Sequence, residues 1–354
     1  MNRIIPLVLL CAATCTAQAQ SSLTLYGRVA SGLDFVSNVA QPDGSSKSNF
    51  RFGSNQYGIS WWGLKGTEDL GAGWNAVVNL ESMFTAGTGN VVNNSLFNRY
   101  AYVGLSNSDY GSLWLGAAMS LTDETSAYLD PIGGQVTSLA ALVYGRSWGP
   151  RSNTVTYNSP NFRGFSFRLQ RGFGNRAGNF RGGTTTSSSF TYAFSGVQIY
   201  GVYDEIRDVN GGFSSLYSAS REYLGGATYT WKGLKFFAAY QQLVSSGQTT
   251  IVEPNNPTAA TRSQQAWVGL TYQATPFFQV EGGLYRSIVN HDGGTGTLGV
   301  VGATYLLSKR TILYSTLGLM FNGGNAAFPV EANDSPPLAG HNQQGFYFGM
   351  MHYF

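Results

Sequence analysis

The amino-acid sequence predicts an all-β chain in which sixteen antiparallel strands form a transmembrane up-and-down β-barrel. Three features lead to this prediction: a low content of charge, strand-like alternation of apolar and polar residues, and connections that alternate in length. Only 11% of the 354 residues are charged, whereas 46 are glycine and 14% are aromatic. About a quarter of a typical soluble domain is charged, and a near-neutral mean hydropathy of −0.10 fits neither a disordered chain nor a bundle of membrane helices.

The charge balance argues against a nucleic-acid partner. The chain has 21 Lys and Arg against 18 Asp and Glu, which gives a formal net charge of +3. Nucleic-acid binding needs a strong basic patch or stripe, and the sequence contains no run rich in Lys or Arg. We therefore expect no nucleic acid among the partners.

Residues 1–19 have the organisation of a cleavable signal peptide. Arg3 supplies a short positive region, residues 4–13 are apolar, and residues 17–19 form a small-x-small cleavage site. We expect cleavage at the end of this segment, which leaves residues 20–354 as one barrel domain. Beyond the segment, no window of about eighteen apolar residues occurs, so we expect no membrane-spanning helix.

Both cysteines of the chain, Cys11 and Cys15, lie in the expected signal segment. The mature chain would then contain neither a disulfide nor a cysteine metal site. The alternative is a lipoprotein cleaved before Cys15, but residues 12–14 lack the large aliphatic side chain that usually lies three positions ahead of such a cysteine.

From residue 22 onward, short segments alternate apolar and polar side chains, as strands with one oily face do. Phe165, Phe167 and Leu169 alternate with polar side chains in one segment, and Leu298 and Val300 belong to the apolar set of another. We expect these oily faces to point toward lipid and the opposite faces to line the interior.

The connections between the strands alternate strictly between short and long. Seven are tight turns, at residues 67–72, 106–110, 159–163, 195–196, 232–233, 274–276 and 307–310. Eight are long, at residues 37–55, 85–96, 120–151, 173–183, 205–220, 244–262, 288–295 and 322–343. These connections separate sixteen strands, and their asymmetry is typical of a transmembrane barrel rather than of a soluble β-sandwich, the alternative. Unpaired amides are costly in hydrocarbon, so the first strand must pair with the last.

Aromatic residues cluster near the expected strand ends, where their rings would lie at the lipid headgroups. The clusters are Tyr100 with Tyr102, Phe190 with Tyr192 and Phe194, Tyr229 with Trp231, and Phe277 with Phe278. The alternative for some of them is a packing role.

Several motifs give the chain a specific resemblance to a known family. They lie at residues 22–27 (SLTLYG), 63–71 (GLKGTEDLG), 103–105 (VGL), 109–111 (DYG), 158–165 (NSPNFRGF), 305–311 (YLLSKRT) and 349–354 (GMMHYF). Together they cover almost the entire mature chain. They resemble general diffusion porins of Gram-negative outer membranes, in particular the trimeric sixteen-stranded porins of betaproteobacteria.

The resemblance implies an integral outer-membrane protein that forms a water-filled channel for the passive diffusion of ions and small hydrophilic solutes. It implies no enzymatic activity, cofactor or metal. The implied partners are two further copies in a homotrimer, outer-membrane lipid and lipopolysaccharide, and the barrel-insertion machinery. Phe354 resembles the terminal aromatic that serves as the assembly signal for this machinery, and it shares one strand face with residues 346, 348, 350 and 352.

The resemblance also implies a pore constriction formed by the longest connection, at residues 120–151, which in this family folds into the lumen. We expect acidic residues of this loop to face basic residues of the wall and to set a transverse field across the pore. The acidic set is Asp123, Glu124 and Asp130, and the basic set is Arg28, Lys65 and Arg168. The alternative for any one carboxylate is that it caps a turn or binds backbone amides within the loop.

Two positions depart from the family pattern and remove positive charge from the expected neck. Trp61 stands where the family often has an inward basic residue, and Ala117 and Ala118 stand where it often has Arg and Gln. Adjacent Trp61 and Trp62 must point to opposite faces of a strand, so we expect one of them inside. An inward Trp61 would either pack beneath the loop or offer a flat lumen aromatic to a solute.

Two other functions remain as alternatives. A substrate-specific channel would use Trp61 and lumenal tyrosines as a binding track. An outer-membrane barrel enzyme would need a convergent set of Ser, His and Asp side chains near one rim. The histidines are His291, His341 and His352, two in expected outer loops and one on the last strand, which disfavours an enzyme.

Overall fold

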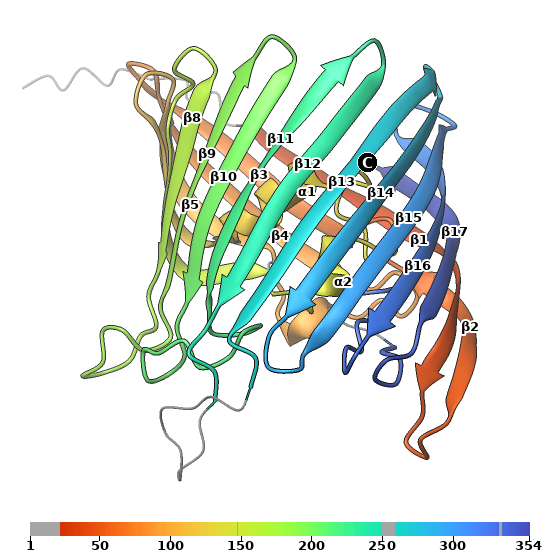
Figure 1. Ribbon diagram of the computed structural model, residues 1–354. Helices are drawn as coiled ribbons and strands as arrows, with labels where there is room; N and C mark the ends of the chain where they lie inside the picture. Colours follow the sequence, from red (N-terminus) through yellow and green to blue (C-terminus); the bar gives the residue numbers. More distant parts are fainter. Residues whose placement is uncertain (1–21, 147, 249–258, 333–334) are drawn as a thin grey trace, which may run out of the picture.

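The computed structural model describes residues 22–146, 148–248, 259–332 and 335–354, which form a closed β-barrel (Figure 1). The expected signal segment at residues 1–19, with Cys11 and Cys15, lies outside the described residues. Within the described ranges, no helix is long and apolar enough to cross a membrane.

The strands are β1 (Ser22–Ala40), β2 (Ser46–Ser54), β3 (Ser60–Gly71), β4 (Trp74–Phe84), β5 (Tyr100–Asn107), β6 (Gly111–Met119), β7 (Pro150–Asn158), β8 (Phe165–Gly172), β9 (Thr185–Phe194), β10 (Val197–Ile206), β11 (Arg221–Trp231), β12 (Leu234–Val244), β13 (Arg262–Thr275), β14 (Phe278–Val289), β15 (Gly294–Leu306), β16 (Thr311–Gly323) and β17 (Gln343–Tyr353).

Antiparallel pairing runs around the whole barrel and joins the first strand to the last. β1 pairs with β17, with Arg28 opposite Tyr353 and Phe35 opposite Phe346. On its other side, the first part of β1 pairs with β3 and the second part pairs with β2. Because β2 and β3 are thus two halves of one interrupted barrel strand, the seventeen segments form a sixteen-stranded barrel. This confirms the expected closure and strand number.

The short turns lie at one end of the barrel and the long loops at the other, as the sequence predicts (Figure 1). The expected loop at residues 37–55 is wrong in extent. β1 continues to Ala40 and β2 begins at Ser46, because Val39 and Ala40 still pair with Lys47 and Ser46 beyond an irregularity in the register. The sequence pattern missed this hairpin, since its outer part is rich in polar residues.

Alternate residues point to the outside and to the lumen, as strand geometry requires. On β17, Phe346, Phe348 and Met350 are about half exposed, whereas Tyr347 and Met351 are buried. On β8, Phe165 and Leu169 are exposed in the same way. The expectation of an apolar outer face is confirmed on these strands.

Part of the inner wall is apolar as well, which corrects the expectation for Leu298 and Val300. Both are buried on the inner face, and Leu298 lies opposite Tyr285 on β14 and Met320 on β16. They belong to one apolar core with residues of the inward-folded loop, Leu142 among them. An inward Leu is tolerated here because the loop covers it, and strand alternation alone could not show that.

Two helices of the connection between β6 and β7 lie inside the barrel (Figure 1). In α1 (Leu121–Leu129), the hydroxyl of the preceding Ser120 accepts a hydrogen bond from the Asp123 amide at 3.1 Å. The second helix is α2 (Leu139–Leu142), and a short 3₁₀ helix, η1 (Val92–Asn94), lies in the β4–β5 loop. α1 packs against β9 to β12, so its opposite side faces the wall from β3 to β8 across the lumen.

Candidate functional site: the neck of the barrel

Glu124 on α1 connects the inward-folded loop to the opposite wall. Its carboxylate forms an ion pair with Arg168 of β8 and accepts a hydrogen bond from the hydroxyl of Tyr100 on β5. Both partners of the ion pair keep about a quarter of their side-chain exposure, 25% for Arg168 and 26% for Glu124. The pair is therefore partly hydrated and lies in contact with the water of the lumen.

A second ion pair lies within the wall itself, between Arg99 and Glu81 of β4. Glu81 also accepts a hydrogen bond from the hydroxyl of Tyr26, which reaches Asn79 at 2.9 Å. The Arg99 guanidinium lies 4.9 Å from the ring centre of Trp61. A cation thus covers the indole that stands where the resembled family often carries a basic residue.

Arg28 and Lys65 have no carboxylate partner among the described residues. The Nε atom of Arg28 donates to the carbonyl of Ile59 at 2.8 Å. The ammonium of Lys65 lies 4.8 Å from the ring centre of Tyr26. These two positive charges remain uncompensated by direct contact, so they contribute to the field of the lumen.

Asp123 lies in the first turn of α1 beside Glu124, and its side chain is half-buried. Burial is the largest influence on this carboxyl and raises its pKa to about 7, although the nearby positive charge of Arg99 acts in the opposite direction. Glu124 raises the pKa further, and Arg151 and Arg28 lower it. The charge at this position therefore changes near neutral pH.

Asp130 forms no ion pair with a basic residue in the described part of the chain. It lies just after α1, where it accepts hydrogen bonds from the Tyr285 hydroxyl at 2.7 Å and from the Ile132 amide at 3.0 Å. Burial raises the pKa of this carboxyl to about 6, although both hydrogen bonds act against the shift. The expected placement of Asp130 against wall arginines is wrong, because the carboxylate stabilises the turn after α1 instead.

Trp61 points into the lumen and Trp62 to the outside, as the register of β3 against β1 shows, since Trp61 lies opposite Arg28. The Trp61 ring meets Tyr26 edge to face at 5.1 Å. In this register, Trp61 shares the inner face with Arg28. Its contacts with Tyr26 and Arg99 fit a packing role better than an open binding surface.

Tyr100 and Tyr102 are lumenal, which corrects their expected place at the headgroups. Tyr100 is buried and contacts Glu124, and Tyr102 stacks on Trp114 with ring centres 4.4 Å apart. Phe190 is 41% exposed and Trp231 is 49% exposed, on the outer face. Both kinds of aromatic have the same sequence pattern, so only the register separates them.

Sequence reasoning missed Arg99, although it contributes directly to the neck. It lies immediately before β5, whose inward residues are Tyr100 and Tyr102. Strict alternation would place residue 99 on the outer face, but the strand begins one residue later and leaves this side chain free to turn inward. The sequence feature that could have pointed to Arg99 is Glu81, because a buried inward carboxylate needs a cation as partner.

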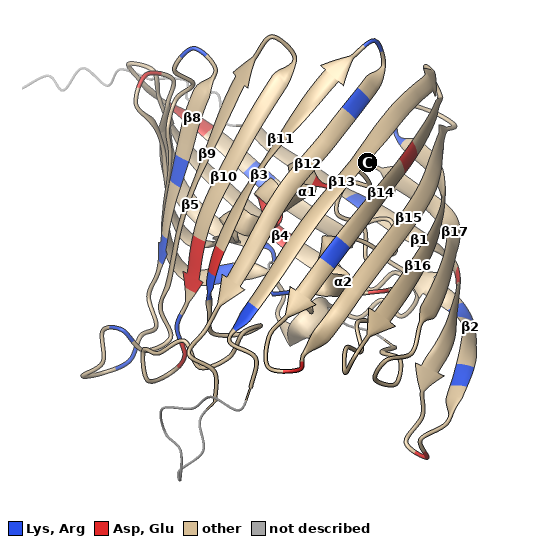
Figure 2. Ribbon diagram, in the orientation of Figure 1, with Lys and Arg blue, Asp and Glu red and all other residues tan. Residues whose placement is uncertain are grey.

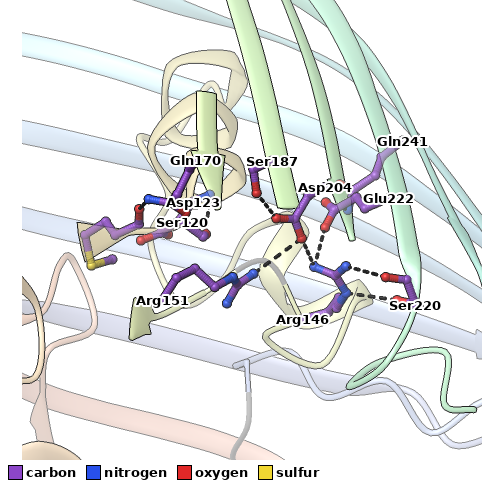
Figure 3. Close-up of polar contacts among 11 residues, drawn as sticks. Ser120, Asp123, Arg146, Arg151, Gln170, Ser187, Asp204, Ser220, Glu222 and Gln241 are labelled. Carbon is purple, nitrogen blue, oxygen red and sulfur yellow. Dashed lines mark hydrogen bonds and ion pairs between the residues drawn. The ribbon is translucent and has the colours of Figure 1, made fainter. Parts of the chain in front are cut away.

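The end of the inward-folded loop is attached to the wall by a buried ion cluster (Figure 3). Arg146 donates to Asp204 at 2.8 Å and to Glu222 at 2.9 Å, and all three side chains are fully buried. Two further hydrogen bonds join Arg146 to the hydroxyl and carbonyl of Ser220 at 2.9 and 3.0 Å. Arg151 lies 3.4 Å from Asp204. This cluster, which the sequence did not reveal, fixes the loop on β10 and β11.

The arrangement places charged side chains of both signs beside the lumen. Charged residues of both signs occur on α1 and on the strands that face it (Figure 2). In the described ranges, no three His, Cys, Asp or Glu side chains gather as a metal site. A closed transmembrane barrel with a loop-narrowed aqueous neck defines a pore-forming protein of the outer membrane.

Comparison with known proteins agrees with this class. The model of the Gram-negative porin family matches residues 7–325, and the chain belongs to this family. An outer membrane porin protein of Bordetella pertussis is 28% identical over 345 residues, which cover 84% of this chain and 89% of the relative. Outer membrane porin protein 32 of Delftia acidovorans is 27% identical over 372 residues, which cover 97% of each chain.

Solved structures show the same fold. The anion-selective porin from Comamonas acidovorans superimposes with a TM-score of 0.80 at 21% identity, over 95% of this chain and all of that chain. A trimeric form of OmpT of Vibrio cholerae gives a TM-score of 0.69 at 14% identity, over 94% of this chain and 99% of that chain. The protein is thus an integral outer-membrane porin, a channel for passive diffusion.

Proposed function

We propose that this porin is a passive, non-enzymatic channel whose neck lies between α1 and the wall from β3 to β8, with a modest preference for anions. The Glu124–Arg168 contact carries the proposal, since it places the loop across the lumen and neutralises one charge of each sign. The proposed constriction includes Asp123 and Glu124 on the loop and Arg28, Lys65 and Arg168 on the wall.

The preference for anions follows from the charges that remain after pairing. Arg99 and Arg168 are each paired with a glutamate, whereas Arg28 and Lys65 are not paired with a carboxylate in the described part of the chain. Opposite them, Asp123 is only partly ionised near pH 7. Two free cations against a fraction of one anion make the local potential positive, which concentrates anions. The Comamonas neighbour is named as anion-selective, but the proposal rests on the charges of this lumen.

A substrate-specific channel is the second candidate, favoured by the lumenal aromatic rings. Tyr102 and Trp114 stack on each other, and the Arg168 guanidinium lies 5.7 Å from the Trp114 ring centre. Such rings can hold a flat solute, but here they already cover one another. Saturable block of the current by one particular solute would favour this alternative.

Assembly and partners are also proposals for this chain. We propose a homotrimer, because a solved neighbour of the same fold is described as a trimer form. Phe354 exchanges backbone hydrogen bonds with Gly27, at 3.1 and 3.3 Å, so it helps to close the barrel. We propose in addition that it is read by the barrel-insertion machinery, and that the outer wall contacts lipid and lipopolysaccharide.

Reversal potentials in a salt gradient across a planar bilayer test the proposed neck. Arg28→Ala removes a free cation and should shift the potential toward cation preference, whereas Asp123→Asn should shift it toward anion preference. Arg176→Ala is the matched control, because Arg176 is exposed in a long loop away from α1 and should leave the potential unchanged. Equal potentials in all three variants and the wild type would refute the assignment of the neck.

A further inference from the structure

A row of neutral polar side chains lines the lumen near the short turns. Asn75 of β4 lies opposite Ser106 of β5, which lies opposite Ser112 of β6. Ser112 in turn lies opposite Asn158, the last residue of β7. The row belongs to the inner face, because Leu113, the neighbour of Ser112, is 43% exposed on the outer face. Short turns of such barrels face the periplasm, so these four residues, the mouth row, lie at the periplasmic mouth.

The mouth row lines a pocket of about 370 Å³. Its two asparagines stand at the ends and its two serines in the middle, so the wall is hollow between the longer side chains. No charged residue is among those that line this pocket in the described part of the chain. The volume falls in the lower part of the range of small-molecule sites, which is roughly 300–1,000 Å³.

Hydrogen bonds hold one end of the mouth row in position. The Nδ2 atom of Asn158 donates to the Ser112 hydroxyl at 3.0 Å, and its Oδ1 atom accepts from the Nε atom of Arg168 at 2.5 Å. Because the Ser112 oxygen is the acceptor in this contact, its own hydrogen can be donated to a solute. This end of the site is therefore ordered before a ligand arrives, which lowers the entropic cost of binding.

The other end of the mouth row offers polar groups that the protein does not use. The side chains of Asn75 and Ser106 are half-buried in the pocket wall, and within the described residues neither forms a hydrogen bond. An asparagine amide supplies two donor hydrogens and one acceptor oxygen, and a serine hydroxyl supplies one donor and an acceptor. Donors and acceptors thus alternate along the row.

An aromatic ring lies next to the mouth row on the side of the neck. A Cβ atom on Gly104 would meet the Cδ1 atom of Trp114 at 2.8 Å, so the indole lies over Gly104, the inner-face residue that precedes Ser106. Tyr102 stacks on this indole, which is half-buried in the wall. A solute at the mouth row therefore has a ring beside it as well as hydrogen-bonding groups.

We infer that the mouth row binds a neutral, hydroxyl-rich solute of the sugar class. An ion would find no opposite charge among the lining residues, and an apolar solute would leave their hydroxyls and amides without partners. Neighbouring strands lie about 4.8 Å apart, a separation close to that of equatorial hydroxyls on alternate carbons of a sugar ring. One sugar can thus contact several members of the row at once.

The inference gives the proposed passive channel a solute class that it retains at its exit, and it rests on the aqueous lumen of that channel. The charges of the neck do not enter it. A retained sugar leaves the narrowest part of the passage before it is held, because the mouth row lies between the neck and the periplasm.

Saturation-transfer-difference NMR of maltose with the full-length protein, in a detergent without a sugar headgroup, tests the inference. We expect a saturable signal with a millimolar Kd in the wild type. Asn75→Leu keeps the size of the side chain but removes its amide, so it should weaken binding about fivefold, as for a lost hydrogen bond. Tetraethylene glycol, which replaces most hydroxyls by ether oxygens, should give no saturable signal.

A pocket-filling variant provides the second arm. Ser106→Phe places a ring in the middle of the row, so it should abolish maltose binding. Asn158 is left intact, because it also positions Arg168. Thr230→Val is the matched control, since Thr230 is an exposed residue near a short turn of β11, outside the pocket lining, and this variant should bind maltose like the wild type.

Three results would each overturn the inference: a wild type that shows no saturation, equal maltose affinity in the wild type, Asn75→Leu and Ser106→Phe, or equal weakening in Thr230→Val and Asn75→Leu. A heat-dependent shift on electrophoresis equal to that of the wild type shows that each variant is folded. Reversal potentials that ignore Arg28→Ala, together with maltose binding that responds to Asn75→Leu, would refute the proposed neck and support the mouth row. The two failures are therefore distinguishable.

Discussion

Arg168 shows at the scale of a single residue how the neck is organised. Its guanidinium bonds to Glu124 on the loop, while its Nε atom donates to Asn158 on the neighbouring strand at 2.5 Å. One side chain therefore joins two strands of the wall to α1. Charge-assisted contacts of this kind are stronger than neutral ones, so the arginine positions the loop. The Glu124 carboxylate in turn offsets part of the electrostatic field of Arg168 in the lumen.

Replacement of Glu124 by glutamine should release this charge. In Glu124→Gln, Arg168 keeps a hydrogen-bonding partner but its positive charge is no longer neutralised. A unit charge about 5 Å from a passing ion is worth about 0.8 kcal/mol in water, in favour of an anion and against a cation, so the ratio of anion to cation permeability should rise roughly fifteenfold. Reversal potentials measure this ratio. A shift toward cations would contradict the assigned contact.

Asp123 should make the selectivity depend on pH. Because burial raises the pKa of this carboxyl to about 7, it is charged above that pH and neutral below it. Anion preference should therefore increase as the pH falls from about 8 to about 5. Asp123→Asn should be anion-preferring throughout this range and lose the transition near pH 7.

Asp130→Asn is the control for this pH dependence. The pKa of Asp130 is raised to about 6, but the carboxyl is buried against Tyr285 and away from the wall arginines. The variant Asp130→Asn should therefore keep the change of selectivity near pH 7 that the wild type shows. A transition that persists in Asp123→Asn and disappears in Asp130→Asn would reverse the two assignments.

At the scale of the element, the inward-folded loop is held at both of its ends. α1 is attached through Glu124, and the segment before β7 is attached through Arg146 to Asp204 and Glu222. Trp267 on β13 adds a hydrogen bond from its indole nitrogen to the Leu129 carbonyl at 2.9 Å. The loop therefore has a fixed position in the lumen, which a size-selective neck requires.

Removal of Arg146 should release one of these ends. Arg146→Met leaves Asp204 and Glu222 buried, and loss of one partner from a buried ion pair typically costs about 3–5 kcal/mol. We expect larger and noisier single-channel currents, because the loop then moves away from the wall. Limited proteolysis of the loop, followed on gels, should be faster than in the wild type.

A triple variant separates the role of charge from the role of packing. Arg146→Met with Asp204→Asn and Glu222→Gln removes the unpaired charges, so it should recover most of the resistance to proteolysis. If the single variant keeps the quiet current of the wild type, the ion cluster does not hold the loop.

Comparison of sequence and structure at this scale shows what strand patterns can and cannot reveal. The alternation predicted the strands and their outward faces, such as Phe165 with Leu169 on β8, because lipid and water impose opposite requirements on neighbouring residues. The prediction from alternation failed at Leu298 and Val300, because the inward-folded loop rather than water covers these inner-face side chains. The partners of Asp130 and Arg146 could not be predicted, since they lie far away in sequence.

At the scale of the whole molecule, closure and the inward loop together produce the function. Pairing of β1 with β17 satisfies the backbone groups that would otherwise meet lipid. The apolar core lies between the loop and the inner wall of β10 to β16, so one side of the lumen is filled. The open passage is displaced toward the wall that carries Arg28, Lys65 and Arg168.

Single-channel recording with a cysteine in the neck tests this account most directly. Ser126 lies on α1, half-buried, and Ser188 lies in an apolar groove of the outer wall. In the chain expected after removal of residues 1–19, Ser126→Cys and Ser188→Cys would each introduce the sole cysteine. The account predicts stepwise ohmic currents that a charged, thiol-specific reagent reduces in Ser126→Cys and leaves unchanged in Ser188→Cys. Absence of current, or a current insensitive to modification at residue 126, would contradict it.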